Sequence, residues 1–184
     1  MSPLDILLQV VERLNGLNIP YMLSGAFATS FYGRIRSTHD IDLVVEIGQH
    51  DAGRIFETFG NDYYVSMDMI EDAIRHRSMF NLIHNETTTK VDFWMLEDSS
   101  FDRSRFSRRK EESLEGTLVS ISMPEDLIVI KLDWFKRSGV HKHYEDALGI
   151  VLVQQDTLDI EYIRGWCERL FLEELLDRLL GETR

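Results

Sequence analysis

The segment from Tyr21 to Ile47 constrains the fold most, because it carries two aspartates one residue apart at the start of an apolar strand. A short apolar run, a glycine turn, a helical patch and a basic loop lead into Asp40-Ile41-Asp42. Successive side chains of a strand point to opposite faces, so Asp40 and Asp42 share one face and the apolar residues form the other. Neighbouring carboxylates repel unless positive charge lies between them, and Mg²⁺ binds such oxygen pairs while keeping sites for phosphate and water. The segment therefore predicts a site for a metal ion and nucleotide phosphates.

The composition is typical of a compact intracellular protein. The 184 residues are 43% hydrophobic, which is enough for one large domain or a domain with a helical appendage. The single cysteine, Cys167, allows no disulfide within the chain, which fits a reducing cytoplasm. The sequence contains no signal-peptide pattern and no apolar run of membrane-spanning length, so we expect a soluble cytoplasmic protein without membrane contact.

The formal net charge of −12 argues against a protein that coats nucleic acid, which would normally be basic. An enzyme that touches one RNA end through a local basic patch remains compatible with this charge. One candidate patch consists of Arg103, Arg105, Arg108, Arg109 and Lys110. The alternative is that this run is an ordinary solvated face, partly neutralised by the two glutamates that follow it.

Apolar periodicity, turn residues and helix caps predict a mixed sheet of four or five strands followed by a helical C-terminal part, an α/β (α+β) chain. The candidate segments for these strands are 21–23, 41–47, 63–66 (weak), 79–84, 90–96 and 118–121. We expect helices at 3–14, 26–32, 51–59, 69–76, 124–138, 144–153, 160–169 and 171–180. The leucines near the C-terminus supply more apolar surface than one exposed helix needs, which indicates core packing first and a dimer or partner interface second.

Two blocks of residues resemble one known superfamily. The first is Gly25-Ala26-x-Ala28 followed by Tyr32-Gly33-x-x-Arg36-x-Thr38-x-Asp40-Ile41-Asp42. The second is Pro124-Glu125-Asp126-Leu127 to Lys131 with Tyr144-x-Asp146. Together they resemble the DNA-polymerase-beta-type nucleotidyltransferases, and within them the small bacterial members that include toxins of abortive-infection toxin–antitoxin pairs. The resemblance implies a nucleotidyltransferase fold, with a catalytic domain at residues 1–122 and a helical region at 123–184 packed on it.

The superfamily has a third carboxylate on a later strand, and Asp92 is the candidate here. It is an acidic residue inside the apolar strand Lys90 to Met95, where a charge is costly without a partner. If that strand neighbours the strand that contains Asp40 and Asp42, the three carboxylates meet. The alternative is a structural salt bridge from Asp92 to Lys90 or to an arginine.

The resemblance also implies roles for the site residues. Asp40, Asp42 and Asp92 are expected to hold two Mg²⁺ ions, with Mn²⁺ as a substitute. The residues expected to bind the nucleotide are Ser24, Gly25, Ala26, Arg36 and Lys131. Lys131 is alternatively a snorkelling surface lysine. The superfamily usually has a second glycine or a serine where this chain has Ala26, so the backbone contact to phosphate is kept and one hydroxyl ligand is lost.

The function expected from these residues is transfer of a nucleoside monophosphate from an NTP to an acceptor hydroxyl. The resemblance leaves three acceptor classes open, namely a tRNA 3′ end, a protein and a small molecule, and it leaves open an antitoxin partner and a homodimer. A catalytically degenerate binding module that keeps the fold is the alternative function, and Ala26 is the residue that favours it. Hydrolysis at the acidic cluster is a third reading, although the chain lacks the histidine-rich ligand set common in such sites.

Overall fold

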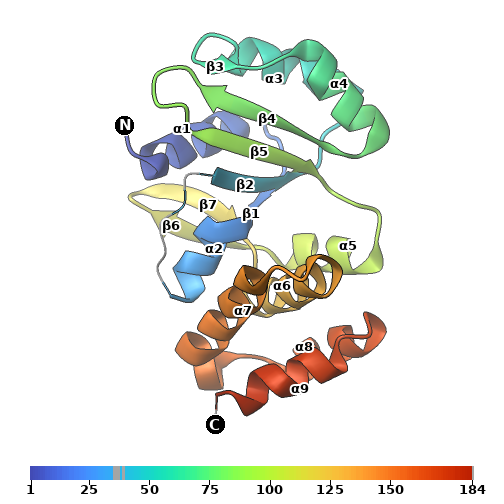
Figure 1. The fold of residues 1–184 in the computed structure, drawn as a ribbon. Coiled ribbons are helices and arrows are strands. Elements are labelled where there is room, and N and C mark those ends of the chain that lie inside the picture. Colours follow the sequence, from blue (N-terminus) through green and yellow to red (C-terminus); the bar gives the residue numbers. More distant parts are fainter. Residues whose placement is uncertain (35–37, 39, 184) are drawn as a thin grey trace. The chain divides into compact units, whose positions relative to one another are not determined.

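The computed structural model describes residues 1–34, 38 and 40–183. The strands in this part of the chain are β1 (Tyr21–Leu23), β2 (Asp40–Val45), β3 (Tyr63–Tyr64), β4 (Met79–His84), β5 (Lys90–Met95), β6 (Lys110–Leu114) and β7 (Thr117–Ile121). The helices are α1 (Pro3–Gly16), α2 (Gly25–Tyr32), η1 (Gln49–Asp51), α3 (Ala52–Phe59), α4 (Met67–His76), α5 (Ser100–Arg108), α6 (Pro124–Ser138), α7 (His141–Gln154), η2 (Gln155–Thr157), α8 (Ile160–Arg169) and α9 (Glu173–Gly181) (Figure 1). The chain divides into two compact units, Met1–Phe27 with Ser37–Ile121 and Ala28–Arg36 with Ser122–Arg184.

The first unit is built on a mixed sheet. Its described residues form seven strands in the order β3-β4-β5-β2-β1-β7-β6. The pairs β2–β5 and β1–β7 are parallel and the other four pairs are antiparallel. The predicted α+β class with a mixed sheet is confirmed. The predicted number of four or five strands is wrong, chiefly because β6 has the sequence KEESL, whose charged residues carry no apolar alternation.

One face of the sheet forms the main core. Phe93 of β5 stacks on Phe80 of β4 with ring centroids 4.9 Å apart, and it meets Phe59 of α3 edge-on at 6.2 Å. Tyr63 donates a hydrogen bond of 2.6 Å to Gln9 of α1. Aromatic packing against α1 and α3 therefore covers the apolar face of the central strands, while their other face carries Asp40, Asp42 and Asp92 together with a smaller apolar cluster.

The opposite face carries α5 near the carboxyl end of β2. Phe106 of α5 packs with Met22, Val44 and Leu96 in a buried apolar cluster. The sequence indicates only a basic segment here, and the helix begins where the Ser99 side chain accepts a hydrogen bond of 3.0 Å from the backbone N–H of Asp102. This cap is the local signal that identifies α5.

The second unit is helical, with α6 packed against α7 and α8. Gly33, at the end of α2, lies close to the backbone of α7, because a Cβ at Gly33 would be 3.1 Å from the backbone nitrogen of Ile150. Among the C-terminal leucines, Leu172, Leu176 and Leu179 are buried. Their burial supports core packing, the first of the two interpretations of these leucines. Within the described ranges, no helix combines the length and the apolar character needed to cross a membrane.

Candidate functional site

Asp42 and Asp92 are direct neighbours across two parallel strands. The register of β2 and β5 pairs Asp42 with Asp92 and Asp40 with Lys90. Since paired residues of adjacent strands project from the same face, Asp40, Asp42 and Asp92 share the polar face of the sheet. Asp40 is exposed, Asp42 is half-buried and Asp92 is only 5% exposed. The structure therefore brings together the three carboxylates that the sequence predicts as a site.

Lys90 supplies the nearest positive charge to Asp92. Its Nζ donates a hydrogen bond of 2.8 Å to Asp92 Oδ2, while Asp92 Oδ1 is buried without a hydrogen-bond partner among the described residues. Burial raises the pKa of the Asp92 carboxyl, and the Lys90 hydrogen bond opposes that rise. The same hydrogen bond raises the pKa of the Lys90 ammonium, and the charges of Asp40 and Asp42 act in the same direction. A protonated Lys90 thus lies in the field of all three carboxylates.

Gly25 brings the turn before α2 directly against Asp42. Its φ is +59°, and a Cβ placed there would lie 1.9 Å from Asp42 Oδ2. The backbone N–H of Ser24 donates a hydrogen bond of 2.9 Å to the Asp42 carbonyl. Only glycine combines this backbone conformation with this close approach. The turn therefore presents the first backbone groups of α2 beside the carboxylate.

Ser24 and Ala26 flank this glycine and are both buried. The Ser24 Oγ has no hydrogen-bond partner in the described part of the chain. A buried hydroxyl without a partner is costly, so it marks a place where a ligand oxygen or a water would be stabilised. The side chain of Ala26 is a methyl group, so it offers no hydroxyl to a ligand.

Trp94 is a member of the site that the sequence analysis does not single out. Its Nε1 donates a hydrogen bond of 3.3 Å to Asp42 Oδ1, and the residue is 45% exposed. The alternation of β5 places Lys90, Asp92 and Trp94 on one face, so the same two-residue period that identifies Asp92 also identifies Trp94. The indole therefore orients the Asp42 carboxylate and leaves an aromatic surface in contact with solvent.

Two predicted nucleotide-binding residues are not among the described residues of the first unit. Arg36 is not among the described residues. Lys131 belongs to α6 in the second unit, where its Nζ donates a hydrogen bond of 2.6 Å to Asp146 Oδ2 of α7. Lys131 is 2% exposed, so the alternative of a snorkelling surface lysine is wrong. Its predicted role toward the nucleotide stays a prediction.

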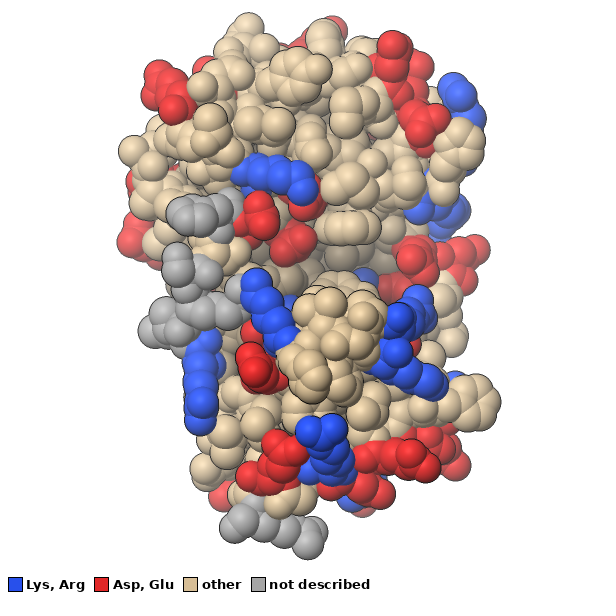
Figure 2. Space-filling model, viewed as in Figure 1, with Lys and Arg blue, Asp and Glu red and all other residues tan. Residues whose placement is uncertain are grey.

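The basic run around α5 is largely engaged by side chains of the protein itself. Arg105 is buried and pairs with Asp102 at 2.6 Å, and Arg103 pairs with Glu46 at 2.6 Å. The Arg109 guanidinium lies 4.1 Å from the centroid of the Phe106 ring. Figure 2 shows lysine and arginine side chains interspersed with aspartate and glutamate over the face in view. These pairings reduce the positive charge that the run offers to an RNA.

Comparison with known proteins supports the fold. No family model matches the sequence, and no curated protein matches it. The antigenic nucleotidyltransferase-like protein from Paracoccidioides brasiliensis has a similar structure, with 18% identity, a TM-score of 0.56 and coverage of 94% of this chain and 91% of that chain. ANT(2″)-Ia in complex with adenylyl-2″-tobramycin is 12% identical with a TM-score of 0.58, and the alignment covers 92% of this chain and 97% of that chain. The lincomycin-bound lincosamide adenylyltransferase LnuA is 13% identical with a TM-score of 0.52, and the alignment covers 78% of this chain and 93% of that chain.

The similar structures share an architecture and not a closely related sequence, so the likeness concerns the fold. The resemblance to the nucleotidyltransferases that the motifs around Gly25 and Asp40-Ile41-Asp42 indicate is confirmed at this level. The chain has the nucleotidyltransferase fold.

Proposed function

We propose that the protein is a nucleotidyltransferase that moves a nucleoside monophosphate from an NTP to an acceptor hydroxyl in a reaction dependent on Mg²⁺. The observation that carries the proposal is the pairing of Asp42 with Asp92 on the polar face, with Gly25 packed against the Asp42 carboxylate. Similar structures include adenylyltransferases, which supports the reaction class.

The side chains present have the donor chemistry of a divalent-cation site, although as placed in the described part of the chain no three acidic or histidine residues form a group that would hold a metal ion. Three carboxylates on one face are oxygen ligands of the kind that Mg²⁺ prefers, and Asp92 Oδ1 is a buried acceptor without a partner in the described chain. Asp40, Asp42 and Asp92 would hold the metal. When bound, Mg²⁺ supplies positive charge to the triphosphate oxygens and increases the acidity of the acceptor hydroxyl. Mn²⁺ has similar ligand preferences and would serve as a probe.

The turn before α2 would bind the phosphates. Backbone N–H groups at the start of a helix point along the helix dipole and favour anions, and Gly25 and Ala26 are the first two residues of α2. The Ser24 hydroxyl lies beside them and would donate a further hydrogen bond. Ala26 contributes its backbone and not a hydroxyl, so phosphate binding would depend on Ser24 and the main chain.

Lys90 has two consequences for the reaction. In the structure it holds Asp92 Oδ2, so it balances carboxylate charge that would otherwise be uncompensated on a mostly buried side chain. Its own side chain is 39% exposed, which leaves room for the ammonium to move. As phosphates bind, the Lys90 ammonium would move from Asp92 to a phosphate oxygen. Asp92 would then be able to accept the proton of the acceptor hydroxyl.

A panel of α-labelled NTPs tests the proposal. Each NTP would be incubated with Mg²⁺ and with tobramycin, lincomycin, total tRNA or a cell extract as the source of protein acceptors. We expect label on one acceptor class, with stoichiometric release of pyrophosphate and loss of both signals in Asp42→Asn. Pyrophosphate release without labelled acceptor would indicate hydrolysis. Absence of nucleotide binding and of turnover with all four NTPs would contradict an enzyme and support the binding-module alternative.

A further inference from the structure

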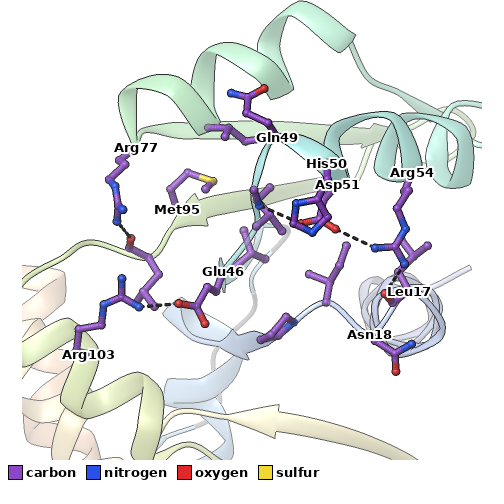
Figure 3. A pocket seen from close by; sticks show the side chains of 17 residues that line it. Leu17, Asn18, Glu46, Gln49, His50, Asp51, Arg54, Arg77, Met95 and Arg103 are labelled. Atoms are coloured by element: carbon purple, nitrogen blue, oxygen red, sulfur yellow. Dashed lines mark hydrogen bonds and ion pairs between the residues drawn. The ribbon is translucent and has the colours of Figure 1, made fainter.

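A pocket of ≈ 740 Å³ lies within the first unit, at the carboxyl ends of the parallel strands β2 and β5 (Figure 3). Val45 ends β2 and pairs with Met95 at the end of β5. Ligands of sheets with parallel strands commonly bind beyond the carboxyl ends of those strands, and this volume is in the usual range for a small-molecule site. Its position and size make the pocket a candidate binding site.

The pocket is separate from the three carboxylates. Asp40 begins β2 and Val45 ends it, so the two sites lie at opposite ends of one strand. A strand rises about 3.3 Å per residue, which puts Val45 and Met95 roughly 10 Å along the strands from Asp42 and Asp92 and roughly 16 Å from Asp40. The side chains of Val45 and Met95 also alternate to the face opposite Asp42 and Asp92, so the pocket is treated as a second site.

The floor of the pocket is apolar. Ile19, Val45 and Leu96 line it and are at most 4% exposed, and the half-buried Ile47 and Ile74 extend this surface. Of these residues, the half-buried Ile47 and Ile74 keep apolar surface that a ligand could cover, at about 25 cal/mol per Å² removed from water. The ligand should therefore have a hydrocarbon or aromatic part.

The rim carries more positive than negative charge. Three arginines and two carboxylates line the pocket, in a chain whose net charge is −12. Arg103 pairs with Glu46 at 2.6 Å and Arg54 pairs with Asp51 at 2.9 Å, which uses both carboxylates. The remaining arginine, Arg77, donates its Nη1 to a backbone carbonyl at 3.3 Å. Within the described ranges Arg77 therefore has a carbonyl partner and no carboxylate partner.

Arg77 is well placed to meet a ligand. The carbonyl that it contacts belongs to Leu96, a residue of the pocket floor. Figure 3 shows Arg77 and Arg103 at one end of the pocket, with Met95 beside them and Arg54 at the other end. A guanidinium has five N–H donors, so Arg77 keeps donors for a carboxylate or phosphate.

We propose that this pocket binds a small amphipathic anion, with an apolar body on the floor and a carboxylate or phosphate head at Arg77. The apolar floor and the arginine without a carboxylate partner carry the proposal, which does not depend on the reaction proposed for the carboxylates.

The test uses 8-anilinonaphthalene-1-sulfonate, an aromatic anion whose fluorescence increases in apolar sites. We expect saturable binding of one molecule per chain, weakened about tenfold in Arg77→Gln, which removes the charge and keeps a donor for the Leu96 carbonyl. The matched control is Arg75→Gln, because Arg75 is an exposed arginine in the last turn of α4, two residues before Arg77, and lies outside the pocket lining. A second variant, Ile74→Trp, should fill the pocket and reduce binding with the Arg77 contact intact.

Competitors identify the head group. Displacement by octanoate but not acetate would assign a carboxylate ligand, and displacement by octyl phosphate but not inorganic phosphate would assign a phosphate ligand. Equal dye binding in Arg77→Gln and Arg75→Gln would overturn the proposal. So would unchanged binding in Ile74→Trp, or failure of both octyl competitors. Circular dichroism melts of each variant ensure that loss of binding reflects the pocket and not unfolding.

Discussion

Asp42 of β2 lies directly opposite Asp92 of β5, in a parallel pair where both side chains project from the polar face of the sheet. Two residues separated by fifty positions in the sequence thus become nearest neighbours across the strands. Because their charges repel, the pair is stable only with compensating charge, and Lys90 supplies it in the structure through Asp92. The paired carboxylates therefore favour a positive charge beside them.

We expect Asp42→Asn to abolish turnover while the fold is retained. The Asn side chain keeps an oxygen that accepts from Trp94 and removes one repelling charge, so the melting temperature should stay within about 3 °C of wild type. Activity should fall at least about a hundredfold, because one of the carboxylates proposed to bind the cation is lost. Asp98→Asn, at a carboxylate 74% exposed, is the control. Near-normal turnover of Asp42→Asn would show that the reaction does not depend on this carboxylate.

Gly25→Ala should destabilise the protein and impair nucleotide binding. The new Cβ would be 1.9 Å from Asp42 Oδ2 and the backbone has φ +59°, so we expect a loss of about 1–3 kcal/mol in the free energy of unfolding. Gly53→Ala in α3 is the matched control, since a Cβ there has no heavy atom within 4 Å. That change should be neutral or stabilise the helix by up to about 1 kcal/mol. Equal urea midpoints for the two variants would contradict the close approach of Gly25 to Asp42.

Lys90→Met should increase the affinity of the protein for Mn²⁺ without nucleotide. In the proposed metal site the ammonium of Lys90 would compete with the ion for Asp92, so its removal should tighten Mn²⁺ binding by about tenfold. Electron paramagnetic resonance of free Mn²⁺ measures this directly. Lys110→Met, which removes an exposed lysine paired with Glu112, should leave Mn²⁺ binding unchanged. Weaker Mn²⁺ binding in Lys90→Met would mean that Lys90 organises the carboxylates and does not compete for them.

Lys131→Met should cost about 3–5 kcal/mol of unfolding free energy, because it leaves the buried Asp146 carboxylate without its lysine. The double variant Lys131→Met with Asp146→Leu should recover most of that loss, since both charges are then removed. Urea unfolding of the single and double variants gives the comparison. If both variants are equally destabilised, the loss comes from packing and not from the missing lysine charge beside Asp146.

Cys167 should be unreactive in the folded protein. It is fully buried, and burial raises the pKa of its thiol to about 12. At about pH 8 roughly one thiol in ten thousand would be the reactive thiolate. Ellman's reagent should therefore label Cys167 only in denaturant, and rapid labelling of native protein would show that α8 opens under native conditions.

The sequence predicts the local parts of the site well. Gly25, Asp40 and Asp42 are read from short-range rules, namely the glycine turn and the two-residue period of a strand, and each lies where those rules put it. The hairpin of β4 and β5 is also local, because a short turn joins two apolar runs.

The non-local parts are harder to predict. The parallel pairing of β2 with β5 joins distant segments that no turn links. The sequence therefore predicts that Asp42 and Asp92 meet only if these two strands are neighbours in the sheet. The buried pair of Lys131 with Asp146 is missed for the same reason, since its partner lies on another helix. Strand β6 is missed because tertiary pairing with β7 overrides its charged composition.

Mn²⁺ titration of wild type, Asp42→Asn and Asp92→Asn, followed by electron paramagnetic resonance with a non-hydrolysable NTP analogue present, tests the central claim most directly. The wild type should bind Mn²⁺ saturably, and each aspartate variant should weaken binding by at least about tenfold while its unfolding midpoint stays near that of wild type. Wild-type affinity in both variants would contradict the claim that these paired carboxylates form the metal site.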